Sequence, residues 1–142
     1  TRLKEVAGRE RTGFGWEVAP DGMRELLQRL AHDYPPIPIY LTENGASYED
    51  QLEADGSVQD TARRDYFIRH LHALRQALQQ GVDVRGYFAW SLIDNFEWAE
   101  GYLRRFGMVH IDFATQQRTV KQSGHWFRHF LHHSADVDRQ QK

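Results

Sequence analysis

The chain of 142 residues is as long as one domain or part of one, because domains typically hold about 100–200 residues. Its composition, 40% hydrophobic and 27% charged, excludes a disordered or collagen-like polymer. The net charge of −2 argues against a nucleic-acid-binding protein, and the absence of cysteine excludes disulfides, thiolate metal sites and a cysteine nucleophile.

The first half of the chain predicts a helix followed by a strand. Residues 1–16 are polar and glycine-rich, which indicates irregular structure. Pro20 suits the first position of a helix, and Pro35 and Pro36 end it. Between them, apolar residues recur at helical spacing at Met23, Leu26, Leu27 and Leu30. The almost continuously apolar run 37–42 predicts a strand buried on both faces, as in a parallel sheet.

The second half repeats this order. Asp60 is the expected N-cap of a second helix, and Gly81 suits the position just after its end. An apolar segment, 82–92, predicts a second strand, and an aromatic, charged loop over 95–106 follows. Segments 108–113 and 118–120 can pair as a hairpin. The aromatic residues around Trp126 mark a third helix, and we expect a flexible tail over 134–142.

Alternating helices and strands indicate an α/β fold with parallel strands. Two such strands cannot bury both of their faces, and a (β/α)8 barrel needs eight strands and typically about 250 residues. We therefore expect residues 1–142 to form a single partial domain. It would belong to a larger barrel or be completed by further copies of the chain.

Polar residues follow both strands at their carboxyl ends, where ligands bind in α/β proteins. Glu43 follows the first strand, which would hold it on a rigid element as a nucleophile or base requires. A loop-capping carboxylate is the alternative. The segment 90–106 mixes aromatic rings with carboxylates, and sugars bind to both kinds of group. Core aromatics with solvated charges would give the same pattern.

The two segments together resemble glycoside hydrolase family 1, the β-glucosidase family. The resemblance lies in Leu41-Thr-Glu-Asn-Gly45 and in the segment from Trp90 to Gly107. It extends to Gly15-Trp-Glu-Val18, to Val84–Trp90 and to Arg118-Thr-Val-Lys121 with Trp126-Phe-Arg128. It implies the C-terminal portion of a (β/α)8 barrel, with strands 7 and 8 and their flanking helices.

The resemblance also implies a retaining hydrolase that removes terminal β-D-glucosyl residues from a β-glucoside or small oligosaccharide. Glu43 matches the family's carboxylate nucleophile. Trp90 matches the platform under the sugar, and Glu97 matches the acceptor of its 4- and 6-hydroxyls. Trp98 lies beside that acceptor, and Phe106 matches an aromatic near the sugar's 6-position. A neutral sugar is favoured over a phosphorylated one; glucose, galactose and fucose remain open.

The family's acid/base lies in an Asn-Glu-Pro motif that this sequence lacks. Neither Asp94 nor Glu100 matches it. We therefore expect either a complementing N-terminal fragment or a homo-oligomer, of which a tetramer would supply eight strands. The alternative function is a non-catalytic sugar-binding or structural fragment.

Four of the eight histidines lie on the third predicted helix, at His125, His129, His132 and His133. Pairs at i, i+4 can chelate zinc or nickel, but we favour a polar outer face and expect no metal and no cofactor.

The sequence has neither an apolar run long enough to span a membrane nor a visible signal peptide. We therefore expect a cytoplasmic protein without membrane or nucleic-acid partners.

Overall fold

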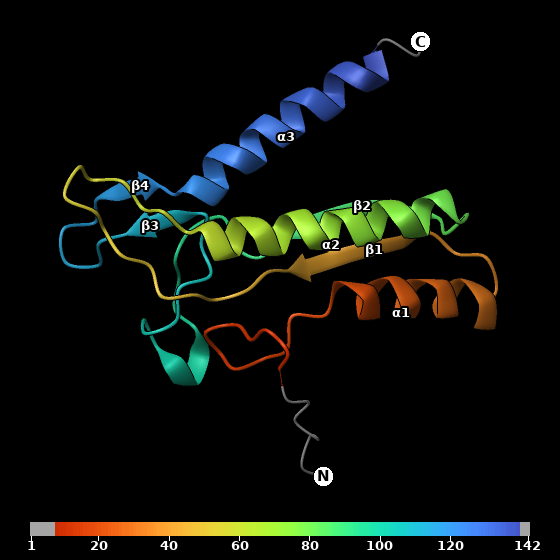
Figure 1. Ribbon diagram of the computed structural model, residues 1–142, viewed down its shortest axis with the longest axis horizontal. Helices are drawn as coiled ribbons and strands as arrows, with labels where there is room; N and C mark the ends of the chain where they lie inside the picture. The colour runs from red at the N-terminus through yellow and green to blue at the C-terminus, as the bar shows by residue number, and fades with distance from the viewer. Residues whose placement is uncertain (1–7, 140–142) are drawn as a thin grey trace.

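The computed structural model describes residues 8–139, in which helices and strands alternate as predicted (Figure 1). The elements are α1 (Pro20–Asp33), β1 (Ile39–Asn44), α2 (Thr61–Gln79), β2 (Val84–Ala89), the 3-10 turn η1 (Trp98–Glu100), β3 (Val109–Ile111), β4 (Arg118–Val120) and α3 (Gln122–Arg139). None of the described helices combines the length and apolar character needed to cross a bilayer.

Two small sheets organise the chain. β1 and β2 pair in parallel, with Ile39 opposite Val84 and Asn44 opposite Ala89, so both strands end at one edge. β3 and β4 pair antiparallel, with Val109 opposite Val120, which confirms the predicted hairpin. The connection from β1 to β2 runs through α2, as a parallel pair requires.

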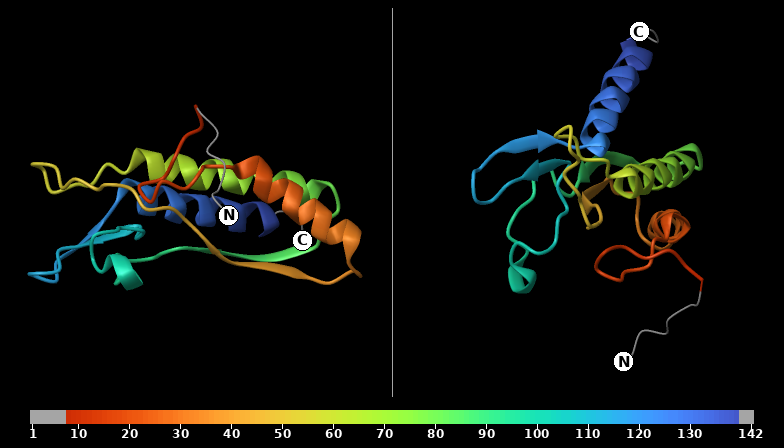
Figure 2. Two further views of the ribbon diagram at one scale, coloured as in Figure 1. Left: turned by 90° about the horizontal axis from the view of Figure 1, so that it is seen from below. Right: turned by 60° about the vertical axis from the view of Figure 1, so that its left-hand side comes forward.

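Helix α2 joins the two hydrophobic clusters of the core. Its second half packs with α1 and the helix-facing side of the sheet through Leu27, Leu74, Ala77 and Val82. Its first half packs with the loop after β1 and the β3 region through Tyr66, Phe67, Ala46 and Met108. All three helices lie on one side of the β1–β2 sheet (Figure 2, left). The scaffold is therefore a sheet covered on a single face.

The opposite face of the sheet is open. Tyr40 is 53% exposed and Phe88 is 57% exposed. They flank Gly86, where an added Cβ would come within 2.5 Å of the Tyr40 ring. The expectation that both strands are buried on both faces is wrong for this chain, because no described element lies on that side.

The start of α2 and the extent of β2 also differ from expectation. Asp60 precedes α2 but makes no side-chain cap; its carboxylate instead accepts hydrogen bonds from the Arg63 guanidinium (2.5 Å) and the Ser123 backbone amide (2.7 Å). β2 spans only Val84–Ala89, which is shorter than the expected 82–92 at both ends. α3 runs to Arg139, since no glycine or proline follows Gly124, and the flexibility of residues 134–142 stays a prediction. Residues 140–142 lie outside the described residues.

A buried cluster of charges connects α2, α3 and the loops between them. The side chains of Arg63, Lys121, Asp50, Asp60 and Asp94 are all 0% exposed. Arg63 pairs with Asp50 at 2.8 Å, and the Lys121 ammonium bonds to both Asp50 and Asp94. Removing one member of such a cluster leaves an uncompensated charge in the interior.

Replacing Lys121 with methionine tests this cluster. Two buried carboxylates would lose their shared cation, so we expect Lys121→Met to lower the free energy of unfolding by about 3–5 kcal/mol. The measurement is urea denaturation followed by circular dichroism. Arg64→Met is the matched control, since the Arg64–Asp65 pair is partly exposed and contributes about 0–1 kcal/mol. Equal losses in the two variants would refute a structural role for the buried cluster.

Candidate functional site

The five residues that the sequence analysis singled out line one cavity. This cavity of about 320 Å³ lies at the carboxyl ends of β1 and β2. Its lining comprises Trp16, Glu43, Gly45, Trp90, Glu97, Trp98 and Phe106. Four segments that are far apart in the sequence meet there, namely the loop before α1, the end of β1, the residue after β2 and the loop 96–106.

The backbone at the strand ends brings Glu43 and Trp90 to this cavity. Glu43 is the penultimate residue of β1, and the Trp90 amide donates to the Asn44 carbonyl (2.8 Å), extending the pairing beyond β2. A Cβ added at Gly45 would lie 1.6 Å from the Trp90 carbonyl oxygen. Only glycine therefore allows the two segments to approach so closely.

The side chain of Asn44 ties the end of β1 to its neighbours. Its Oδ1 accepts a hydrogen bond from the Tyr87 hydroxyl (2.7 Å), and its Nδ2 donates to the Tyr66 hydroxyl (3.3 Å). Burial raises the pKa of both tyrosines. At neutral pH they therefore keep their protons, and the Tyr87 donor is always present. These bonds fix the backbone beside Glu43 from β2 and from α2.

Glu97 is oriented by its neighbours in the cavity. Its Oε1 accepts hydrogen bonds from Trp90 Nε1 (3.3 Å) and Asn95 Nδ2 (3.0 Å). Both bonds end on Oε1, which leaves Oε2 as an acceptor for a ligand. The indole of Trp90 thus connects Glu97 to the strand-end region that presents Glu43.

Aromatic rings form the wall on the far side of the cavity. Phe106 is buried at 3% exposure and lies 5.8 Å from the Phe14 ring and 6.4 Å from the Trp16 ring. Trp98 is 85% exposed and has a φ of 44°, a conformation that costs a non-glycine residue about 1–3 kcal/mol. Trp16 was not predicted as a site residue, although its motif had been noted.

The loop 94–107 is held in place by Asp94. This carboxylate accepts hydrogen bonds from the amides of Gly107 (3.0 Å) and Ile111 (3.3 Å), and it pairs with Lys121 (2.8 Å) and Arg105 (2.6 Å). Burial raises its pKa, but the two cations outweigh burial and hold the pKa below the ordinary value. A carboxylate that stays ionised under these bonds anchors the loop and is unsuited to donate a proton.

The remaining acidic groups near the site are also engaged. Glu100 pairs with Arg104 at 3.1 Å, and neither residue lines the cavity. Ligand atoms of Asp50, Asp94 and His110 lie within 4.8 Å of one another, a spacing that could hold a metal ion. The Lys121 ammonium, however, already bonds to both carboxylates of that group. This cluster is therefore an internal ion-pair network.

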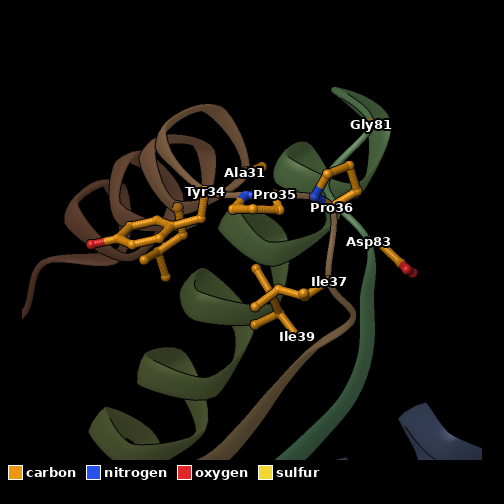
Figure 3. Close-up of a pocket in the computed structure, with 9 residues that line it drawn as sticks. Ala31, Tyr34, Pro35, Pro36, Ile37, Ile39, Gly81 and Asp83 are labelled. Atoms are coloured by element: carbon orange, nitrogen blue, oxygen red, sulfur yellow. The ribbon is translucent and has the colours of Figure 1, made fainter.

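A second cavity, of about 420 Å³, lies at the amino ends of the strands (Figure 3). Its lining is mainly apolar and includes Tyr34, Pro35, Pro36 and Ile37. Asp83 at its edge is paired with Arg85 at 2.9 Å. Asp83 is the only carboxylate among the described residues that line this cavity, and it is already paired, so the cavity does not offer the two carboxyl groups that a glycosidase needs.

Comparison with known proteins gives one consistent family. The model of the family described as Glycosyl hydrolase family 1 matches residues 3–135. Beta-glucosidase A of Thermotoga maritima is 45% identical over 128 residues, which cover 90% of this chain and 29% of the relative. The bifunctional beta-D-glucosidase/beta-D-fucosidase of Bifidobacterium breve is 49% identical over 129 residues, which cover 87% of this chain and 28% of that relative.

The same likeness appears in three dimensions. The solved structure of the family 1 β-glucosidase from Thermotoga maritima superposes with a TM-score of 0.87 at 44% identity, covering 89% of this chain and 29% of that one. Further structures of that enzyme contain isofagomine lactam and glucoimidazole. The chain thus spans less than a third of the length of these relatives.

Replacing Gly45 with alanine tests the close approach that forms the cavity. The new methyl group would overlap the Trp90 carbonyl, so we expect Gly45→Ala to destabilise the chain by about 1–3 kcal/mol. Gly22→Ala is the matched control: Gly22 lies in α1, where a Cβ would meet only Ala19 at 3.7 Å. We expect that change to stabilise by about 0.5–1 kcal/mol. Thermal unfolding of both variants checks whether their changes in stability have opposite signs. An unfolding temperature of Gly45→Ala equal to that of the unchanged chain would contradict the close approach at Gly45.

Proposed function

Because the chain belongs to glycosyl hydrolase family 1, we propose that it carries the nucleophile of a retaining, β-glucosidase-type glycoside hydrolase. Its fold is the C-terminal part of that family's (β/α)8 barrel, with two of the eight strands. In such barrels the active site lies at the carboxyl ends of the strands. The cavity that contains Glu43 occupies this position.

The observation that carries the proposal is the shared cavity of Glu43, Trp90 and Glu97. Its volume of about 320 Å³ lies at the lower end of the range of about 300–1,000 Å³ typical of small-molecule sites. Apolar rings alternate there with carboxylates, which suits the C–H faces and the hydroxyls of a sugar. A single sugar unit is the ligand that fits this composition.

In the proposed reaction, a Glu43 carboxylate oxygen attacks the anomeric carbon of a β-glucoside. The bond to the aglycone breaks, its electron pair leaves with the aglycone oxygen, and a covalent glycosyl-enzyme forms. Water then attacks the same carbon from the other side and gives up a proton, which balances the departed aglycone oxygen; this releases the sugar with its β configuration and frees Glu43. Trp90 lies under the ring, and Glu97 accepts hydrogen bonds from its hydroxyls.

A second carboxyl group about 5–5.5 Å from Glu43 would protonate the aglycone oxygen. The sequence has no Asn-Glu-Pro motif to supply it, and Asp94 is tied to two cations. We therefore place the acid/base outside this stretch of chain. A substrate with a good leaving group, such as dinitrophenyl β-glucoside, depends least on that acid.

The free edges of the β1–β2 sheet are where further barrel strands would pair, and the open face would then line the barrel interior. Tyr40 and Phe88 are exposed there, and each strand has one edge without a partner among the described elements. Exposed apolar faces of this kind mark interaction surfaces. The missing strands would come from a further part of a longer protein or from other copies of the chain.

A second candidate function is sugar binding without turnover. It is favoured by one observation, namely that Glu43 and Glu97 are the only carboxylates among the residues that line the described cavity. Glucose bound without hydrolysis of even activated glucosides would support this function.

Trapping of the intermediate tests Glu43. We expect a 2-fluoro dinitrophenyl glucoside to add one sugar to the chain, because the fluorine slows hydrolysis of the glycosyl-enzyme. Mass spectrometry of a digest would place the sugar on the peptide that contains Glu43. Glu43→Gln should abolish the label, whereas Glu49→Gln, a change of an exposed carboxylate outside the cavity, should retain it. A label that survives Glu43→Gln would overturn the assignment.

The mass in solution tests how the sheet is completed. We expect the isolated chain to associate, since the open face and strand edges are otherwise left in water. Light scattering should give a mass several times 16.7 kDa, and Phe88→Lys on the open face should reduce it. A well-folded monomer would exclude completion by copies and leave a longer protein as the source.

A further inference from the structure

The exposed surface of α3 carries a pair of histidines whose rings are in contact. His129 and His133 lie one helical turn apart, and both are exposed. Their ring centroids are 3.9 Å apart with an interplanar angle of 41°. Side chains at i, i+4 share one helix face, and the two imidazole rings lie against each other there.

The protonation pattern of His133 is set by the helix backbone. Its Nδ1 lies 3.0 Å from the carbonyl oxygen of His129. A carbonyl only accepts, so Nδ1 carries the proton and donates it, and the Nε2 lone pair is free. Histidines that ligate metals are oriented in this way, with one ring nitrogen bound to the backbone and the other to the metal.

From this geometry we propose that His129 and His133 chelate a divalent transition-metal ion. Neutral imidazoles favour Zn²⁺, Ni²⁺ and Cu²⁺ over the hard ions Mg²⁺ and Ca²⁺, which take oxygen ligands. Two protein ligands leave the other coordination positions to water, unlike a closed structural zinc site with four. Sequence spacing alone favours a polar face; the contact between the two rings and the contact of His133 Nδ1 with the His129 carbonyl are the structural facts that point to a ligand.

The site is separate from the cavity around Glu43. α3 extends away from the sheet in Figure 1 and in the right-hand view of Figure 2. Neither histidine lines the Glu43 cavity. The metal site can therefore be tested without any enzymatic activity, and its failure would leave the proposed hydrolase function untouched.

Calorimetric titration of the chain with NiCl2, repeated with ZnCl2, tests the proposal. We expect one equivalent to bind, and both His129→Gln and His133→Gln to weaken binding at least about tenfold. Removing a residue that only orients a metal ligand typically lowers metal affinity about 10–100-fold, so removing a ligand itself should cost at least the lower of these factors. His32→Gln is the matched control, because this exposed histidine of α1 has no second histidine one turn away. Circular dichroism verifies that the variants keep their helices.

Histidine 15N NMR with Zn²⁺ provides the second measurement. We expect the His133 Nε2 resonance to shift on addition of metal while Nδ1 remains protonated. His125→Gln should retain the affinity within about twofold. The proposal is overturned if His133→Gln binds as tightly as His32→Gln, if His125→Gln instead abolishes binding, or if the wild-type chain binds no metal.

Discussion

The candidate site depends on the close approach of two backbones, at Gly45 after β1 and at Trp90 after β2. The Trp90 amide bonds to the Asn44 carbonyl, and the missing side chain of Gly45 leaves room for the Trp90 carbonyl. This contact sets a carboxylate and an indole at the same strand edge. The Trp90 indole then donates a hydrogen bond to Glu97, which fixes the aromatic loop relative to the ends of the strands.

Buried charge holds that loop to the scaffold. Asp94 connects the amides of Gly107 and Ile111 to Lys121, and Lys121 reaches Asp50, which pairs with Arg63 on α2. Such a network is costly unless every member is paired, so it tolerates few alternative arrangements. The network thereby connects the loop to α2, the helix that packs on the β1–β2 sheet. The position of the loop in turn fixes the positions of Phe106 and Glu97.

The order of elements could be predicted because its signals are local, whereas Trp90, Glu97, Trp98 and Phe106 were expected in the site from the family resemblance. Pro20 begins α1, Gly81 has a φ of 89° after α2, and Glu43 ends an apolar run. Interactions between distant segments were not visible in the sequence. Asp60 has the residue type of an N-cap, yet Arg63 and Ser123 take its oxygens. Trp16 enters the site only because the loop before α1 folds against Phe106. No sequence pattern marked Lys121 as buried.

A crystal structure of the chain with glucoimidazole, the inhibitor held by the Thermotoga maritima relative, tests the central claim most directly. We expect the sugar-like ring to lie against the Trp90 indole, with its hydroxyls on Glu97 and its anomeric position facing Glu43. An inhibitor bound elsewhere on the chain, with the cavity at the strand ends unfilled, would contradict the account.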